Sequence, residues 1–154
     1  MHLSPIIIKK ITRKSATQPP YPHGHIVKGV FTGISVEVYD SDSIRRIYEK
    51  GCYGKGNKSR GASSVVTKNA AHDTECLTLE LEESCFLSYF LGVLCIHNRA
   101  FCHTFWESYA YTSKDNKSEF LESLAAYMYL KAKGCLIKSG IKFGGDFCKY
   151  LIHM

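Results

Sequence analysis

The stretch "VEVYDSDSIRRIYEKG", residues 36–51, combines the signals of a strand with those of a helix that follows it directly. Val36 and Val38 alternate with polar residues, and this period of two is typical of a strand with one buried face. A similar apolar segment precedes it, and the Thr32-Gly33 pair between the two segments is a turn signal. The sequence therefore predicts two strands joined by a turn within residues 26–39.

A short helix is predicted immediately after the second strand. Asp40 or Ser41 suits its N-cap position, because a short side-chain oxygen can accept a hydrogen bond from the first helical turn. Gly51 suits the position that follows the end of the helix. One apolar stripe recurs at helical spacing and is expected to face the core: Ile44, Ile47 and Tyr48.

The middle of the chain predicts a brief strand at Leu77 and Leu79, followed by a buried helix over residues 81–96. Glu82 and Glu83 lie near the N-terminal end of this helix, where the helix dipole favours negative charge. Because the two side chains are adjacent in sequence, they diverge in direction on a helix. They are therefore interpreted as helix-end charges rather than as an acid–base pair.

The C-terminal part of the chain predicts a helix over residues 119–133, capped by Ser118 and ended by Gly134. Strands are expected to return at Cys135, with a hairpin turn at Ser139-Gly140. The inner face of the helix is expected to consist of Phe120, Leu121, Leu124 and Met128.

Strands, then helices, then strands predict an α+β chain with two small lobes. Residues 1–24 contain all four prolines and few apolar residues, so we expect a basic, flexible and largely unpacked arm. Residues 25–112 are expected to form an N-terminal domain with an internal linker at about 57–75. Residues 118–154 are expected to form the start of a second domain.

The composition is that of a soluble globular protein, with 45% apolar and 22% charged residues among 154. The longest apolar stretch, residues 85–96, is shorter than the roughly 20 residues that span a bilayer, so no membrane partner is expected. Seven scattered cysteines lack the pattern of a disulfide framework, which indicates reduced core thiols of an intracellular protein. The group of Cys95, His97, Cys102 and His103 fits no zinc module, and neither a metal nor another cofactor is expected.

The formal net charge of +6 favours an acidic partner, of which nucleic acid is the commonest. The basic run at residues 9–14 fits either a solvated arm or a nuclear-import patch. Residues 50–64 form a basic, glycine-rich loop that could cradle phosphate, but the Walker pattern is absent, and a helix cap with a flexible linker is favoured. The sequence contains neither a nucleophile elbow nor an HExxH motif, so the residues alone define no catalytic constellation.

Three blocks of sequence follow one another in a defined order. They are "VEVYDSDSIRRIYEKGCYGKG" (36–56), "LTLELEESCFLSYFLGVL" (77–94) and "AYMYLKAKGCLIKSGIKFGGDFCKY" (126–150). Together they resemble the tRNA-splicing endonuclease family, and within it the catalytic subunit that cuts the 5′ splice site. The resemblance runs from Gly29 to Tyr150. It implies a small N-terminal α/β lobe followed by a helix and an incomplete nuclease sheet.

The resemblance also implies a metal-independent cleavage of intron-containing pre-tRNA. In the family, a ribose 2′-hydroxyl attacks its own phosphate and leaves a 2′,3′-cyclic phosphate and a 5′-hydroxyl. This reaction needs a proton acceptor, a proton donor and a cation, roles that the family assigns to a tyrosine, a histidine and a lysine. Tyr150 matches the tyrosine, because it ends the pattern Lys-Phe-Gly-x-Asp-Phe-x-x-Tyr. Lys138, Lys142 and Lys149 are candidate RNA-binding residues from their place near Tyr150.

The matches to the family's histidine and lysine are expected beyond Met154. His153 is no substitute, because three residues along a strand span roughly 10 Å and turn the side chain to the opposite face. We therefore expect this chain to be inactive alone and to have an exposed sheet edge that carries Phe147, Leu151 and Ile152. Whether the chain itself is an enzyme stays open at this point.

Three functions are considered. The first is a nuclear endonuclease subunit that acts with other tRNA-splicing endonuclease subunits. The second is a truncated, non-catalytic isoform that serves as a structural or RNA-binding subunit. The third, a small basic RNA-binding protein without enzymatic ancestry, is disfavoured by the three blocks together. The expected location is the nucleus, with the cytoplasm and the outer mitochondrial surface as alternatives.

Overall fold

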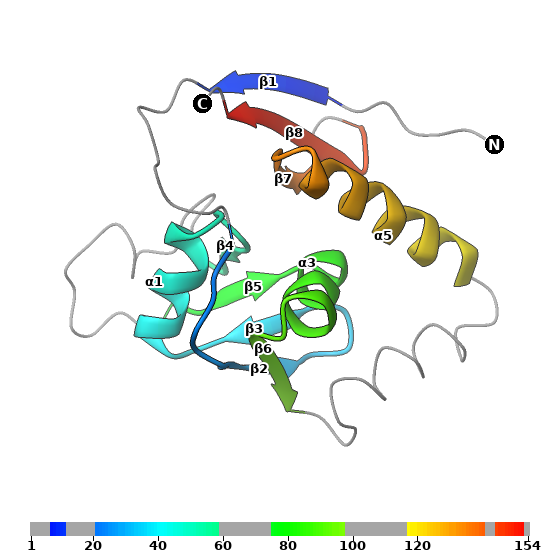
Figure 1. Ribbon diagram of the computed structural model, residues 1–154. Coiled ribbons are helices and arrows are strands. Elements are labelled where there is room, and N and C mark those ends of the chain that lie inside the picture. The colour runs from blue at the N-terminus through cyan, green and yellow to red at the C-terminus, as the bar shows by residue number, and fades with distance from the viewer. Residues whose placement is uncertain (1–6, 12–20, 59–74, 98–116, 141–143, 153–154) are drawn as a thin grey trace. The chain divides into compact units, whose positions relative to one another are not determined.

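The protein has two compact units (Figure 1). Residues 20–117 form one, called here the middle unit, and residues 1–19 with 118–154 form the other, called the terminal unit. Each unit has its own sheet and helical structure, so the predicted α+β class is confirmed. The computed structural model describes residues 7–11, 21–58, 75–97, 117–140 and 144–152.

The middle unit is built on a mixed sheet of five strands. The strands are β2 (Val27–Phe31), β3 (Val36–Val38), β4 (Lys55–Gly56), β5 (Leu77–Leu79) and β6 (Leu94–His97). Their order in the sheet is β4-β5-β3-β2-β6, and only the pair of β2 and β6 is parallel. The predicted turn between β2 and β3 is confirmed, because the backbone N–H of Thr32 donates to the carbonyl of Ser35 at 2.9 Å.

Helix α1, Ser41–Glu49, follows β3 as the sequence predicts. Asp40 is its N-cap, and its carboxylate accepts hydrogen bonds from the hydroxyl and the backbone N–H of Ser43 at 2.6 and 2.9 Å. Because these bonds stabilise the charged form, they lower the pKa of Asp40. Ile44 and Ile47 are fully buried, so the predicted apolar stripe does anchor the helix in the core.

The helix predicted over residues 81–96 is wrong in its second half. Helix α3, Leu81–Cys85, continues as a π-helix, η1 (Phe86–Phe90), and the chain then turns at Gly92, whose φ of 64° favours glycine. Beyond this turn lies strand β6, in which buried and more exposed residues alternate. A short apolar run such as residues 94–97 is compatible with either a helix or a strand, and it forms a strand here because it pairs with β2.

Phe86 of η1 joins three segments of the middle unit through ring contacts. Its ring centroid lies 5.6 Å from that of Tyr21, 6.2 Å from that of Tyr53 and 6.4 Å from that of Phe90. Tyr53 is almost completely buried, and this burial raises its pKa above the ordinary value. The aromatic contacts therefore fix the segment before β2 and the turn before β4 against the same helix.

The two ends of the predicted linker at about 57–75 are joined by hydrogen bonds. The backbone N–H of Asn57 donates to the carbonyl of Cys76 at 3.1 Å, and the backbone N–H of Lys58 donates to the buried carboxylate of Glu75 at 3.0 Å. Residues 59–74 of this linker lie outside the described residues. The same holds for residues 98–112 of the predicted N-terminal domain.

The terminal unit combines helix α5, Lys117–Ala132, with a three-stranded sheet. Its strands are β1 (Ile7–Ile11), β7 (Leu136–Ser139) and β8 (Phe147–Ile152), in the order β1-β8-β7. Tyr127 of α5 contacts Phe147 of β8 with ring centroids 5.8 Å apart. The helix therefore packs on the β7–β8 hairpin.

The predicted ends and inner face of α5 are partly correct. The helix begins at Lys117, one residue before the predicted cap Ser118, and the chain leaves it at Gly134 with a φ of 71°. Apolar residues occur on most sides of this helix, so the packing against the sheet selects the buried face. Of the predicted inner face, Leu121 is 42% exposed. The residues that are buried most deeply are Tyr127, Leu130 and Lys131.

Strand β1 corrects two expectations. Residues 7–11 of the expected unpacked arm form a strand, although residues 12–20 lie outside the described residues. This strand pairs in parallel with β8, from Ile7 opposite Cys148 to Ile11 opposite Ile152, so the expected exposed edge of β8 is wrong. An isoleucine-rich segment suits a strand, and the pairing supplies partners for the backbone groups of β8.

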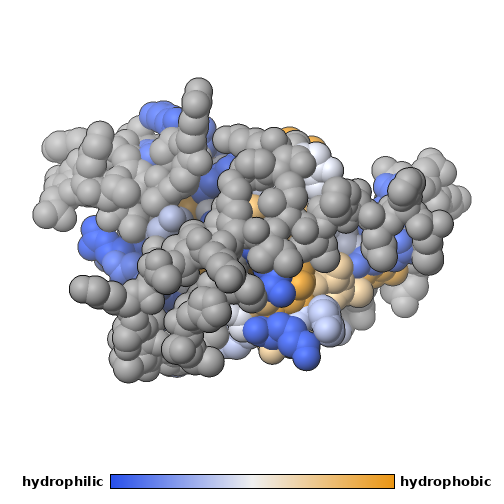
Figure 2. Space-filling model, turned by 90° about the horizontal axis from the view of Figure 1, so that it is seen from above, coloured by the Kyte–Doolittle hydropathy of each residue, from blue (hydrophilic) through white to orange (hydrophobic). Residues whose placement is uncertain are grey.

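The described surface is mixed, with hydrophobic residues in orange beside hydrophilic ones in blue in Figure 2. Among the described helices, none combines the length and the apolar character that crossing a bilayer requires. Most of the described cysteines are core residues, as predicted, and burial raises the pKa of the Cys76 thiol. The buried ones are Cys52, Cys76, Cys85, Cys135 and Cys148, whereas Cys95 is half-buried.

Candidate functional site

Tyr150, the predicted catalytic residue, lies in β8, the central strand of the terminal sheet. Its backbone is opposite Leu136 of β7 on one side and Lys9 of β1 on the other. The Tyr150 side chain and His153 are outside the described part of the structure. The backbone register nevertheless shows that Tyr150 is held in a strand paired on both edges.

The lysines proposed to bind RNA do not all gather at one place. Lys138 is opposite Cys148, and Lys149 is opposite Ile137. Residues that are opposite in a register share a face of the sheet, and successive residues alternate between faces. Lys138 and Lys149 therefore lie on opposite faces of the hairpin, both half-buried, and Lys142 lies outside the described residues.

The hairpin turn holds β8 at a fixed distance from β7. Gly140 donates its N–H to the carbonyl of Asp146 at 2.9 Å, and Gly145 donates to the carbonyl of Gly140 at 3.3 Å. A Cβ atom added to Gly140 would lie 2.5 Å from the carbonyl oxygen of Gly145, which no side chain tolerates without a backbone shift. The signal at Ser139-Gly140 thus marks the turn correctly, and the second strand begins only at Phe147.

Lys131 is a buried cation near this hairpin that the sequence reasoning missed. Its side chain is 4% exposed, and its ammonium lies 6.0 Å from the ring centroid of Tyr127, which itself contacts Phe147. The signal in the sequence was the spacing of four residues between Tyr127 and Lys131, which places both side chains on one face of α5. The positive charge of Lys131 therefore lies over the Tyr127 ring, which in turn contacts β8 through Phe147.

The glycine-rich loop of the middle unit is not an open phosphate cradle in its described part. The backbone N–H of Gly54 donates to both carboxylate oxygens of Glu83, each at 3.1 Å. Gly54 has a φ of 70°, and a Cβ there would lie 2.8 Å from Leu77, so this approach requires glycine. Glu83 also accepts from the backbone N–H of Glu80 at 3.2 Å. The Glu83 carboxylate therefore occupies the backbone N–H of Gly54 that a bound anion would need.

Glu83 is therefore a structural residue, as the interpretation of a helix-end charge requires. It is 4% exposed and lies in the first turn of α3, where Glu80 is the N-cap. Within the described residues, no group of three His, Cys, Asp or Glu side chains is arranged to hold a metal ion.

Comparison with known proteins relates the middle unit to one protein family. Residues 27–100 match the family described as "tRNA intron endonuclease, N-terminal domain". This part of the chain is therefore similar to the N-terminal domain of tRNA intron endonucleases. The first two resembling blocks, residues 36–56 and 77–94, lie inside this domain, and the third, residues 126–150, follows it.

Relatives that match most of the chain bear the name tRNA-splicing endonuclease. The protein of Saccharolobus solfataricus is 30% identical over 131 residues, and that of Saccharolobus islandicus strain M.16.27 is 29% identical over 131 residues. Each match covers 82% of this chain and 66% of the relative, so the chain spans just under two thirds of these relatives' length. The protein of Methanosarcina barkeri is 26% identical over 143 residues, which is 93% of this chain and 36% of the relative.

Proposed function

We propose that this chain is a subunit of a tRNA-splicing endonuclease that recognises intron-containing pre-tRNA. The observation that carries the proposal is the extent of the match. It covers 82% of the chain and therefore reaches beyond the N-terminal domain at residues 27–100, and the relatives bear the name of the endonuclease. The formal charge of +6 fits a polyanionic substrate.

For the reaction, we propose cleavage at the 5′ splice site that gives a 2′,3′-cyclic phosphate and a 5′-hydroxyl. Tyr150 is proposed as the group that accepts the proton of the ribose 2′-hydroxyl, because its place in the sequence matches the family's tyrosine. Its position in a strand paired with both β7 and β1 supports this role, since a proton acceptor must be held firmly against its substrate. The proposed chemistry uses neither a metal nor a small-molecule cofactor.

Residues 1–154 contain a match to one of the three catalytic residues, so we propose that this polypeptide does not cleave RNA by itself. The other tRNA-splicing endonuclease subunits are its proposed partners, and the nucleus is its proposed location. The alternative is a structural or RNA-binding subunit without a catalytic role, and the experiment must distinguish it from a catalytic subunit.

The test uses residues 1–154 with an intron-containing pre-tRNA and, as a control, the same tRNA without its intron. We expect tighter binding of the pre-tRNA, no cleavage by the chain alone, and co-purification with the other endonuclease subunits of its source organism. Equal binding of both RNAs together with no co-purification would refute the proposed function. Cleavage by the chain alone that is abolished in Tyr150→Phe would refute the proposed inactivity.

Cleavage by the reconstituted complex separates the two subunit roles. If the complex cleaves at the 5′ splice site and Tyr150→Phe abolishes this cleavage, Tyr150 is catalytic. If the complex contains the chain and Tyr150→Phe leaves cleavage unchanged, the structural role holds instead. Alkaline phosphatase checks the chemistry of the new 3′ end, because a 2′,3′-cyclic phosphate resists the enzyme until mild acid opens it to a monoester.

A further inference from the structure

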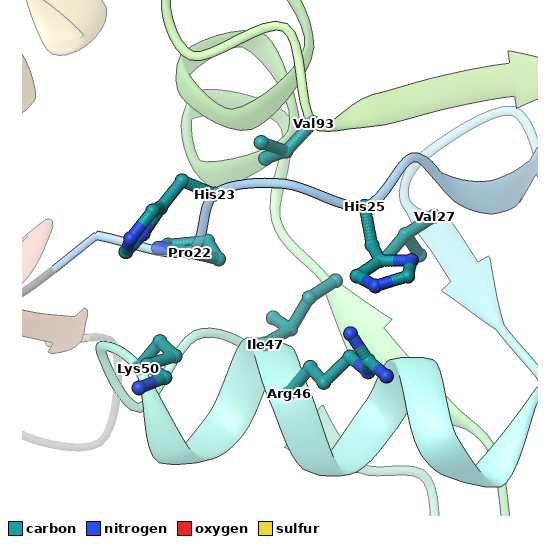
Figure 3. A pocket seen from close by; sticks show the side chains of 8 residues that line it. All are labelled: Pro22, His23, His25, Val27, Arg46, Ile47, Lys50 and Val93. Atoms are coloured by element: carbon teal, nitrogen blue, oxygen red, sulfur yellow. The ribbon is translucent and has the colours of Figure 1, made fainter.

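A small pocket of the middle unit lies between the segment that leads into β2 and the second half of α1 (Figure 3). Its cavity volume is about 70 Å³. Three of the apolar side chains that line it are buried, namely Val27, Ile47 and Val93. Pockets for drug-sized ligands measure roughly 300–1,000 Å³, so this one suits a small group rather than a nucleoside.

The polar residues that line the pocket are all basic or imidazole side chains. They are His23 and His25 from the segment before β2, and Arg46 and Lys50 from α1 and its C-cap. Figure 3 shows His25 with Arg46 at one end of the pocket and His23 with Lys50 at the other. None of the residues lining this described pocket is a carboxylate. The positive charge of Arg46 interacts with the carboxylate of Asp40, the N-cap of α1.

The wall that carries the two histidines is held in place by the rest of the unit. Pro22 is buried, and the ring of Tyr21 lies 5.6 Å from that of Phe86. Nδ1 of His23 donates to the carbonyl of Tyr21 at 3.1 Å, because a carbonyl oxygen can only accept. Gly24, with a φ of 84°, turns the chain between the histidines. Nε2 of His23 is therefore the ring nitrogen that a ligand would meet.

We propose that this pocket binds a phosphate group of an RNA backbone. Its size fits one phosphate, and its lining offers guanidinium, ammonium and imidazole donors with no carboxylate to repel an anion. The base of the pocket is apolar, because the buried side chains of Val27, Ile47 and Val93 form it. Only the choice of RNA as the carrier of the phosphate rests on the proposed function; the binding of the anion does not.

The experiment uses the full chain of residues 1–154 and two probes, inorganic sulfate and a single-stranded uridine octamer. Binding is followed through the imidazole NMR signals of His23 and His25. Arg46→Gln is compared with Arg45→Gln, a matched control, because Arg45 is the adjacent exposed arginine of α1 and does not line the pocket. Arg46→Lys tests whether the charge alone restores binding.

We expect both probes to shift the two imidazole signals, and Arg46→Gln to weaken each affinity about threefold to tenfold, with Arg45→Gln within twofold of the wild type. Arg46→Lys should recover part of the affinity. For the octamer, the slope of log affinity against log salt should fall by about 0.7 in Arg46→Gln, the value for one phosphate contact to a single strand. Unchanged amide spectra outside the pocket establish that each variant is folded.

Three results would overturn the inference. Equal losses in Arg45→Gln and Arg46→Gln would mean that only the net charge matters. Sulfate that leaves both imidazole signals unchanged would remove the anion site itself. Sulfate binding at the pocket with no effect of Arg46→Gln on the octamer would remove RNA as the carrier. Recognition of pre-tRNA is a separate measurement, so its failure refutes the proposed function and leaves the anion site standing.

Discussion

The buried carboxylate of Glu83 is expected to be the strongest single polar contribution to the stability of the middle unit. It joins the loop at Gly54 to the first turn of α3 by accepting from the backbone N–H groups of Gly54 and Glu80 at 3.1–3.2 Å. Glu83→Ala removes the acceptor that these two N–H groups use. The loop that enters β4 then loses its attachment to the helix.

The expected magnitude follows from the number of donors affected. Each buried donor that loses its acceptor costs about 1–3 kcal/mol, which gives roughly 2–6 kcal/mol for two donors. Alanine also removes the desolvation cost of a buried charge, which offsets part of this loss. We therefore expect the free energy of unfolding of the middle unit to fall by about 2–4 kcal/mol.

Hydrogen exchange of the full chain measures this change within one unit. Backbone amides of residues 77–87 that exchange only through opening of the unit should exchange roughly 30- to 700-fold faster, because each 1.4 kcal/mol is tenfold. Glu82→Ala is the matched control, since it removes a neighbouring carboxylate that is only half-buried. Glu83→Gln keeps one oxygen that can accept from both amides and should lose less. If Glu83→Ala and Glu82→Ala accelerate exchange equally, the reasoning fails.

Three further predictions concern a cap, a turn and the thiols. Asp40→Ala should lower the free energy of unfolding by about 1 kcal/mol through loss of the N-cap. Because the pKa of Asp40 is lowered in the folded state, the charged carboxylate stabilises the protein at pH values above the ordinary carboxyl pKa. In urea unfolding, the difference in stability between the wild type and Asp40→Asn should therefore shrink as the pH falls from 6 to 2. Gly140→Ala should cost about 1–3 kcal/mol in thermal unfolding, because the added Cβ meets backbone atoms at 2.5 and 2.8 Å, and an unchanged melting temperature would contradict this. Iodoacetamide should modify the half-buried Cys95 well before the fully buried Cys148, as mass spectrometry of timed samples would show, and denaturant should abolish the difference.

The strand and helix of residues 36–49 were predictable because their signals are local. Alternating valines, an oxygen-bearing N-cap and apolar residues at helical spacing all act within a few residues. The structure agrees with each of them, from Asp40 as the cap to Ile44 and Ile47 in the core. Local physics and tertiary packing favour the same conformation here, and the prediction was correct for that reason.

The errors occur where a partner distant in sequence decides the conformation. Residues 94–97 are apolar enough for a helix and form a strand because β2 is beside them. Residues 7–11 were expected in an unpacked arm and form β1 because β8 offers an edge to pair with. On α5, the hairpin selects which apolar side is buried, so Leu121 is exposed although its hydropathy suggests the core.

The α+β class, the local elements around α1 and, through the three blocks, the resemblance to tRNA-splicing endonucleases can all be predicted from the sequence. Which charged side chains lie near one another becomes clear from the folded structure. It separated Lys138 from Lys149 on opposite faces of one hairpin. It also brought His23 and Arg46, from different elements, to the lining of one pocket. The reason is physical: a motif fixes chemistry along the chain, whereas long-range pairing and packing fix which side chains meet in space.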